Sequence, residues 1–225
     1  MFQILKRIPL FSSLKDEELE AIDKLSLTKK CSKDTIILLE DEEGDTLFII
    51  LQGKVKVSTF SEGGKELIFT ILGEGEFFGD MSLLDGRPRS ATVISIEDTE
   101  LKMIRRSDFH NLIEKHPRIA LKLLEALTLR LRRTDERLES IALLDVTGRI
   151  AGIILQLGDE HGEKIGKSIK IKSRPTHQEL ANMVGTTRET VTRILKQLEN
   201  KKYITMEGKE LTIHDAETFK RDLYF

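Results

Sequence analysis

Short apolar runs alternate with glycine and aspartate through the first hundred residues. Turn-forming pairs such as Gly63-Gly64 and Asp85-Gly86 separate six runs rich in Ile, Val, Thr and Phe: Thr35–Leu39, Thr46–Leu51, Val55–Phe60, Glu66–Leu72, Ala91–Ile96 and Glu100–Ile104. Strands this short, with turns about every 8–12 residues, indicate an antiparallel sandwich, roll or barrel. A short helix precedes them, with Ser13 as its expected cap and Asp16 in its first turn.

Residues 108–145 predict one long helix. Asp108 or Ser107 is suited to cap it, and Pro117 is expected to break or kink its start, so that the regular part runs from residue 118. One narrow seam follows at alternating intervals of three and four residues: Ala120, Leu124, Leu127, Leu131, Thr134, Leu138, Ile141 and Asp145. Charged residues on both sides of the seam favour a parallel homodimeric coiled coil over a helix packed on its own domain.

Residues 146–225 predict a winged helix-turn-helix. Thr176 and Glu179 form a capping box that opens a short helix, and Gly185 ends this helix in a left-handed turn. Thr187 caps the next helix, whose inward positions are Val191, Ile194, Leu195 and Leu198. A hairpin follows, made of Tyr203–Met206, a turn at 207–209 and Glu210–Ile213. An ordinary helical pair is the alternative, but this order of elements is typical of DNA-binding domains.

The outer face of the second helix carries side chains suited to read bases. Arg188 and Arg193 can each donate two hydrogen bonds to guanine O6 and N7, and Glu189 can accept one from cytosine N4. We therefore expect this helix to lie in the major groove of double-stranded DNA.

The net charge at first argues against DNA binding, because the formal total is −2. The total hides a division: residues 147–225 carry 14 basic and 11 acidic residues, whereas residues 1–146 carry 22 basic and 27 acidic residues. Residues 164–202 alone hold ten basic and three acidic residues. This asymmetry favours nucleic-acid contact, with a solvated basic face as the alternative.

Several other protein classes are disfavoured. The longest apolar run is about six residues, far short of the roughly 20 that a membrane helix needs, and the N-terminus lacks a signal-peptide core, so we expect a cytoplasmic protein. A single cysteine, Cys31, excludes an internal disulfide and a cysteine-held iron–sulfur or zinc site supplied by this chain alone. No nucleophile–base pair, metal-ligand cluster or phosphate-binding P-loop is found, so we expect no enzyme, no metal and no covalent cofactor.

Two segments, Leu144–Ile150 and Thr187–Lys196, resemble the cyclic-AMP receptor protein (CRP/FNR) family of bacterial transcription regulators. The resemblance covers nearly the whole chain and includes Phe77–Leu84 and Pro88–Val93. It implies an α+β fold with three parts. These are a cyclic-nucleotide-binding-like antiparallel β-roll over residues 1–107, a dimerisation helix over 108–145, and a winged helix-turn-helix over 146–225.

The segment 79–91 is a candidate nucleotide site. The guanidinium of Arg89 beside the backbone amides of Ser90 and Ala91 can cradle a phosphate, and Asp80 can accept a hydrogen bond from a ribose hydroxyl. An Arg–Asp ion pair that closes the loop is the alternative. The resemblance implies that Gly79 and Asp80 hold the ribose, that Arg89 and Ser90 hold the cyclic phosphate, and that Thr134 meets the adenine. The full set of expected ligand-binding residues is Gly79, Asp80, Met81, Ser82, Arg89, Ser90, Ala91, Arg130, Thr134 and Asp135.

Two departures from the family pattern leave the effector open. Cyclic-AMP members usually have Glu in place of Asp80 and Ser in place of Asp135. The carboxylate of Asp135 suits guanine better than adenine, and Arg130 could neutralise it or reach the ligand; a surface pair between Asp135 and Arg132 is the alternative. Cyclic AMP is favoured, while a guanine cyclic nucleotide, another effector or effector-independent binding stay open. A cyclic-nucleotide-controlled regulatory subunit is a more distant alternative.

The resemblance also implies TGTGA-like half-sites in an inverted repeat, read by two recognition helices about 34 Å apart. The candidate contacts to the DNA backbone are Thr176, His177, Gln178, Thr187, Thr190, Lys196 and Lys209. RNA polymerase is an expected partner, and an exposed, charged loop over Gly158–Ser168 is the segment that could touch it.

Overall fold

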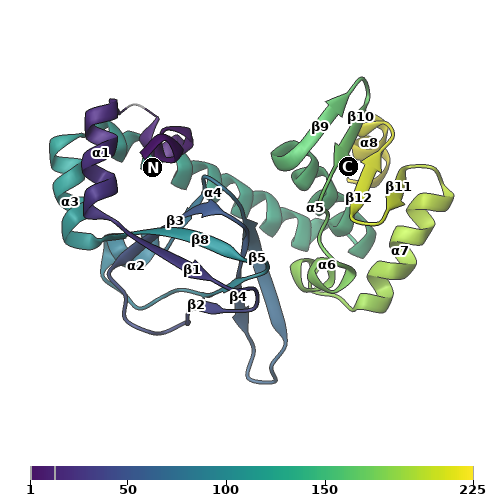
Figure 1. Ribbon diagram of the computed structural model, residues 1–225. Helices are drawn as coiled ribbons and strands as arrows, with labels where there is room; N and C mark the ends of the chain where they lie inside the picture. The colour runs from purple at the N-terminus through teal and green to yellow at the C-terminus, as the bar shows by residue number, and fades with distance from the viewer. Residues whose placement is uncertain (1, 13, 225) are drawn as a thin grey trace. The chain divides into compact units, whose positions relative to one another are not determined.

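The computed structural model describes residues 2–12 and 14–224, so the expected cap at Ser13 lies outside the described residues. The chain divides into two compact units, residues 1–131 and 132–225 (Figure 1). No helix of the described segments is long and apolar enough to cross a membrane.

Two antiparallel four-stranded sheets form the first unit. One sheet has the order β1-β8-β3-β6, with the bounds Leu27–Cys31, Thr99–Arg105, Thr46–Gln52 and Phe77–Phe78. The other has the order β2-β7-β4-β5, with the bounds Ile36–Leu38, Thr92–Ser95, Val55–Phe60 and Glu66–Leu72. This confirms the predicted antiparallel β-roll. The apolar pattern missed β1 and β6, because four of the five β1 residues are exposed and β6 is only two residues long.

Strand β3 is buried on both faces, which explains its uninterrupted apolar sequence. Leu47 and Ile49 belong to the cluster formed with the helices, while Phe48 and Ile50 belong to a second cluster that includes residues of the other sheet. The ring of Phe48 stacks on that of Phe78 with their centroids 5.1 Å apart. The first unit therefore has two apolar layers, one on each side of the β1-β8-β3-β6 sheet.

Helical segments cover one layer of this unit: η1 (Phe2–Arg7), η2 (Pro9–Phe11), α1 (Asp16–Leu25), α2 (Asp80–Asp85), α3 (Arg106–Lys115) and the first part of α4 (Arg118–Leu143). Buried apolar residues of α1, α3 and α4 share one core with β3 and β8. The buried Lys102 Nζ of β8 also donates to Asp23 Oδ1 of α1 at 2.5 Å. Apolar burial and this ion pair together fix α1 against the sheet.

The helix expected over residues 108–145 is in fact two helices. Pro117 separates α3 from α4 as predicted, because proline cannot donate a backbone hydrogen bond within a helix. The N-cap of α3 is Arg105, not Ser107 or Asp108, since β8 runs directly into the helix. Asp145 does not continue the seam: α4 ends at Leu143, and Asp145 Oδ1 caps the next helix by accepting from Gly148 N at 2.8 Å.

Helix α5 (Val146–His161) opens the domain that contains the helix-turn-helix. It is followed by β9 (Gly162–Ile165), β10 (Ser168–Ile171), α6 (His177–Val184), α7 (Arg188–Asn200), β11 (Ile204–Glu207), β12 (Glu210–Ile213) and α8 (Ala216–Leu223). The predicted hairpin is part of a four-stranded sheet with the order β11-β12-β10-β9.

The prediction of an exposed loop over Gly158–Ser168 is wrong. Gly158 is buried inside α5, and β9 and β10 pair as an antiparallel hairpin. A Cβ atom at Gly158 would lie 3.2 Å from Ile169 Cγ2. Ile169 and Ile171 of β10 are buried, and this burial against α5 favours a strand. The many charged residues of the segment made a strand hard to predict from the sequence.

Candidate functional sites

Arg89 lies at the centre of the first candidate site, three residues before the start of β7. Its side chain is only 5% exposed; Nη1 donates to Gly79 O and Nη2 to Thr46 O, each at 3.0 Å. Its Nε is buried without a hydrogen-bond partner, and no carboxylate of the described chain forms an ion pair with it. Burial lowers the pKa of Arg89; Asp45 and Asp80 oppose the shift, whereas Arg106 adds to it. Because buried charges in proteins are normally paired, this guanidinium is suited to bind an anion.

Two glycines make room for the Arg89 side chain. A Cβ atom at Gly44 would lie 2.0 Å from Arg89 Nε, inside the volume of the side chain. Gly79 has φ = 79°, and a Cβ there would lie 2.8 Å from both Arg89 Nη1 and Thr46 O. Gly79 was expected in the site from its sequence motif, whereas Gly44 was not, since the Gly44-Asp45 pair is typical of an ordinary turn.

Asp80, the first residue of α2, is buried with 3% exposure and pairs with Arg130 of α4. Arg130 Nη1 lies 2.9 Å from Asp80 Oδ1 and 3.0 Å from Oδ2, and Nη2 donates to Phe77 O. The guanidinium also lies 4.6 Å from the centroid of the Phe77 ring. An acid–arginine pair therefore closes this segment, as the alternative interpretation held, but the arginine is Arg130 and not Arg89.

The remaining expected ligand residues fall into two groups. Ser90 Oγ donates to Met81 Sδ at 3.3 Å, while Ser82 and Ala91 are buried beside them in sequence. Thr134 and Asp135 are exposed residues of α4 that belong to the second unit. Asp135 forms no ion pair with any residue that the structure describes, so the surface pair with Arg132 is not observed.

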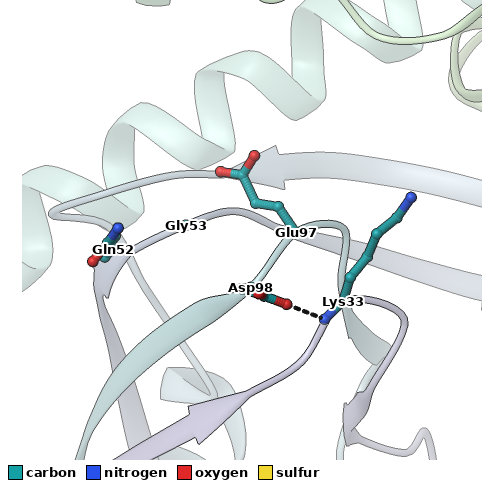
Figure 2. A pocket seen from close by; sticks show the side chains of 5 residues that line it. All are labelled: Lys33, Gln52, Gly53, Glu97 and Asp98. Atoms are coloured by element: carbon teal, nitrogen blue, oxygen red, sulfur yellow. Dashed lines mark hydrogen bonds between the residues drawn. The ribbon is translucent and has the colours of Figure 1, made fainter.

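A separate shallow depression lies among the turns that join the strands of the first unit (Figure 2). Lys33, Gln52, Gly53, Glu97 and Asp98 line it. Asp98 Oδ1 accepts a hydrogen bond from Lys33 N at 2.9 Å, so this carboxylate serves to hold a turn. None of the expected ligand-binding residues lines this depression.

Helices α6 and α7 form the second candidate site, with the caps and turn predicted from the sequence. Thr176 Oγ1 accepts from Glu179 N at 3.2 Å, and Glu179 Oε2 accepts from Thr176 N at 2.7 Å. Gly185 is left-handed with φ = 77°. Thr187 Oγ1 accepts from Thr190 N at 3.2 Å at the start of α7. Caps of this kind satisfy backbone N–H groups that would otherwise lack a partner and fix the residue at which each helix begins.

The first half of α7 presents Arg188, Glu189 and Arg193 to solvent, while its four predicted inward residues are buried. The pKa of Glu189 is lowered because its carboxylate accepts hydrogen bonds from its own backbone N–H and from Thr187. The ionised carboxylate of Glu189 can only accept hydrogen bonds, whereas Arg188 and Arg193 can only donate them. The three residues therefore offer the bases a mixed donor and acceptor pattern.

The expected backbone contacts surround this helix. Thr176, Gln178, Thr187, Lys196 and Lys209 are exposed, and Thr190 is half-buried. His177 Nδ1 lies 2.9 Å from Thr192 Oγ1. Burial lowers the pKa of His177, and the positive charges of Arg174 and Arg188 lower it further, so the imidazole is neutral at pH 7.

Arg174 is a structural contributor that the sequence analysis missed. Its backbone N donates to Lys209 O at 2.9 Å, and its Nη2 donates to Gly208 O at 3.2 Å. These bonds brace the β11–β12 turn that carries Lys209. A lone arginine before a proline gives no sequence signal for such a role.

Comparison with known proteins finds a matching family model in each of the two units. Residues 28–116 match the family model of the cyclic nucleotide-binding domain, and residues 148–221 match that of the Crp-like helix-turn-helix domain. The chain is 32% identical over 221 residues to a CRP-like cAMP-activated global transcriptional regulator of Mycobacterium tuberculosis, covering 98% of this chain and 99% of that protein. The chain belongs to the CRP/FNR family of transcription regulators. The resemblance inferred from its motifs is thereby confirmed.

Other relatives of this CRP/FNR regulator agree. A cAMP-activated global transcriptional regulator CRP of Pasteurella multocida is 38% identical over 187 residues, covering 81% of this chain and 87% of that protein. The catabolite activator protein of Thermus thermophilus is 31% identical with a TM-score of 0.56, covering 96% and 98% of the two chains. A CooA mutant from Carboxydothermus hydrogenoformans has a TM-score of 0.80 at 22% identity, covering 95% and 94%. The relatives from Mycobacterium tuberculosis and Pasteurella multocida are both named as transcriptional regulators.

Proposed function

We propose that this CRP/FNR regulator is a homodimer that binds a TGTGA-like inverted repeat when a cyclic nucleotide occupies the site around Arg89 and Asp80. The observation that carries the proposal is Arg89, a buried cation without an ion pair among the described residues, inside a domain of the cyclic nucleotide-binding family. A cyclic phosphate is an anion that could accept from a guanidinium and from backbone amides.

Cyclic AMP is the effector that we favour, because the Mycobacterium tuberculosis and Pasteurella multocida relatives are named as cAMP-activated. Arg89 and Ser90 would hold the phosphate, and Gly79 and Asp80 the ribose. Helix α4 carries Arg130 and, one turn later, Thr134 and Asp135, to which we assign the choice between adenine and guanine. A guanine-containing cyclic nucleotide is the competing ligand, because the Asp135 carboxylate suits paired guanine donors.

The dimer proposal rests on α4. Seam residues Leu124, Leu131, Leu138 and Ile141 are 58%, 62%, 66% and 56% exposed in the single chain. Large apolar side chains in a line at heptad spacing are typical of a helix that pairs with a second copy. A two-fold dimer would place two α7 helices in successive major grooves and would therefore read an inverted repeat. RNA polymerase is the proposed partner of the DNA-bound dimer.

The decisive experiment measures DNA affinity by fluorescence anisotropy, at one stated salt concentration, on a TGTGA palindrome and on a scrambled duplex. Cyclic AMP is expected to raise affinity for the palindrome, cyclic GMP to raise it less, and Arg89→Ala to abolish both effects. Equal affinity with and without either nucleotide would exclude the effector switch. Sedimentation equilibrium tests the dimer, and a monomer at micromolar concentration would contradict it.

A further inference from the structure

Arg106 is the first residue of α3 and follows β8 directly. Its Nη2 donates to Ser82 O of α2 at 2.5 Å and lies 3.4 Å from Gly44 O. A Cβ atom at Gly86, just after α2, would lie 3.8 Å from Arg106 Nη1. One guanidinium therefore joins three segments that are distant in sequence: the start of α3, helix α2 and the turn at Gly44.

The two segments that Arg106 joins are the ones that enclose Arg89. Gly44 lies against the Arg89 guanidinium, and Gly79, which precedes α2, accepts from Arg89 Nη1. Without Arg106, the carbonyl oxygens of Ser82 and Gly44 would lose this donor, and α2 could move relative to the turn. The position of Arg89 thus depends on a residue with no sequence motif around it.

Arg106 also contributes charge. Its Nε is buried without a hydrogen-bond partner, and the ion pairs of the described residues include none with Arg106. It lies close enough to Arg89 to lower the pKa of that guanidinium. Two like charges in a partly desolvated region repel each other, and an anion bound at Arg89 would relieve this repulsion.

We propose that Arg106 is a positioning residue of the effector site: it holds α2 and the Gly44 turn around Arg89, and its charge strengthens the binding of an anionic phosphate there. This rests on the proposed function, in which a nucleotide phosphate binds at Arg89. The proposed role goes beyond the expected ligand-binding set, which did not include Arg106.

The test compares Arg106→Met and Arg106→Lys with Arg105→Met in the full-length protein. Arg105 is the neighbouring exposed arginine, and its side chain forms no cap hydrogen bond, so Arg105→Met removes the same charge outside the site. Isothermal titration with cyclic AMP and with the neutral nucleoside adenosine, at two salt concentrations, separates phosphate binding from base and ribose binding. Thermal unfolding with and without inorganic phosphate reports anion binding when no nucleotide is involved.

Arg106→Met is expected to weaken cyclic AMP binding at least about tenfold and to flatten its salt dependence. Adenosine, which would contact Asp80 of α2 through its ribose but carries no phosphate, should lose clearly less affinity. Arg106→Lys should restore part of the affinity, and Arg105→Met should match the wild type. Equal losses for cyclic AMP and adenosine, or equal losses in both arginine-to-methionine variants, would overturn the proposal.

Failure of the proposed function has a different signature. The wild type could bind neither cyclic AMP nor cyclic GMP and still show a higher melting temperature in phosphate. In that case the nucleotide is rejected as the ligand. The role of Arg106 is then supported if the phosphate-induced rise in melting temperature is lost in Arg106→Met but kept in Arg105→Met. If phosphate also leaves the wild type unchanged, both the proposed function and the role of Arg106 are rejected.

Discussion

Asp80 and Arg130 share two contacts, 2.9 and 3.0 Å long, between a carboxylate that is almost fully buried and a guanidinium that is about one-third exposed. The pair connects α2 to α4 within the first unit. Its two members are not equivalent: Arg130 also donates to Phe77 O and contacts the Phe77 ring, whereas Asp80 depends on Arg130 for its charged partner.

This asymmetry predicts unequal effects on the free energy of unfolding. Arg130→Met, which leaves a buried carboxylate alone, should cost about 2–4 kcal/mol, and Asp80→Asn about 1–2 kcal/mol. The double variant should be more stable than Arg130→Met alone, because the stranded carboxylate is removed. Urea denaturation measures all three, and strictly additive effects would show that the pair is not coupled.

Gly44→Ala should abolish effector binding as completely as Arg89→Ala. The added Cβ would occupy the position of the Arg89 guanidinium and displace it. Gly73→Ala is the matched control, since no heavy atom lies within 4 Å of a Cβ placed there. Isothermal titration with cyclic AMP gives the readout, and wild-type affinity in Gly44→Ala would show that the contact with Gly44 does not position Arg89 for ligand binding.

The effect of Gly152→Ala on the free energy of unfolding should change sign when Tyr224 is replaced by alanine. In the wild type the new Cβ would lie 2.6 Å from Tyr224 Cε2, so we expect a loss of about 1 kcal/mol. In a Tyr224→Ala background the clash is absent, and the higher helix propensity of alanine should stabilise α5 by about 0.5–1 kcal/mol. Thermal unfolding of the four proteins tests this; the same sign in both backgrounds would show that Tyr224 does not pack on Gly152 in solution.

His177 predicts a pH dependence of DNA binding. Its pKa in the free protein is lowered by burial and by Arg174 and Arg188, so the unfolded chain binds a proton first as the pH falls below 6.5. The folded protein therefore loses stability as the pH falls from this value through the lowered pKa. A DNA phosphate beside the imidazole would favour its protonated form, and DNA affinity should rise on acidification.

The measurement is anisotropy titration between about pH 7.5 and 5.5 for the wild type and His177→Gln. The ratio of wild-type to variant affinity is expected to increase as the pH falls. If the DNA affinities of the wild type and His177→Gln change in parallel with pH, His177 does not contact the DNA phosphates.

Arg188→Ala and Lys196→Ala should weaken DNA binding in different ways. Loss of a base contact at Arg188 should cost about 1–3 kcal/mol on the TGTGA palindrome and relax preference at one base pair. Loss of a phosphate contact at Lys196 should weaken all sequences alike and reduce the salt slope by about one. Competition against single-base variants separates them, and a uniform loss for Arg188→Ala would make it a backbone contact.

The sequence by itself determined the parts of this protein that depend on local patterns. Alternating apolar runs predicted most strands of the β-roll, Pro117 the break before α4, and Thr176, Gly185 and Thr187 the caps and turn of the helix-turn-helix. These features are readable because each depends on backbone geometry or on burial of a single face within a few residues.

Only the tertiary structure decided which distant side chains meet. The sequence cannot show that Arg130 pairs with Asp80 50 residues away, that Arg106 spans α2 and the Gly44 turn, or that Ile169 draws the charged segment 162–171 into a sheet. Arginine looks the same in a sequence whether its guanidinium is solvated or buried. Its role is set by the carbonyl and carboxylate oxygens that long-range packing brings within hydrogen-bond distance.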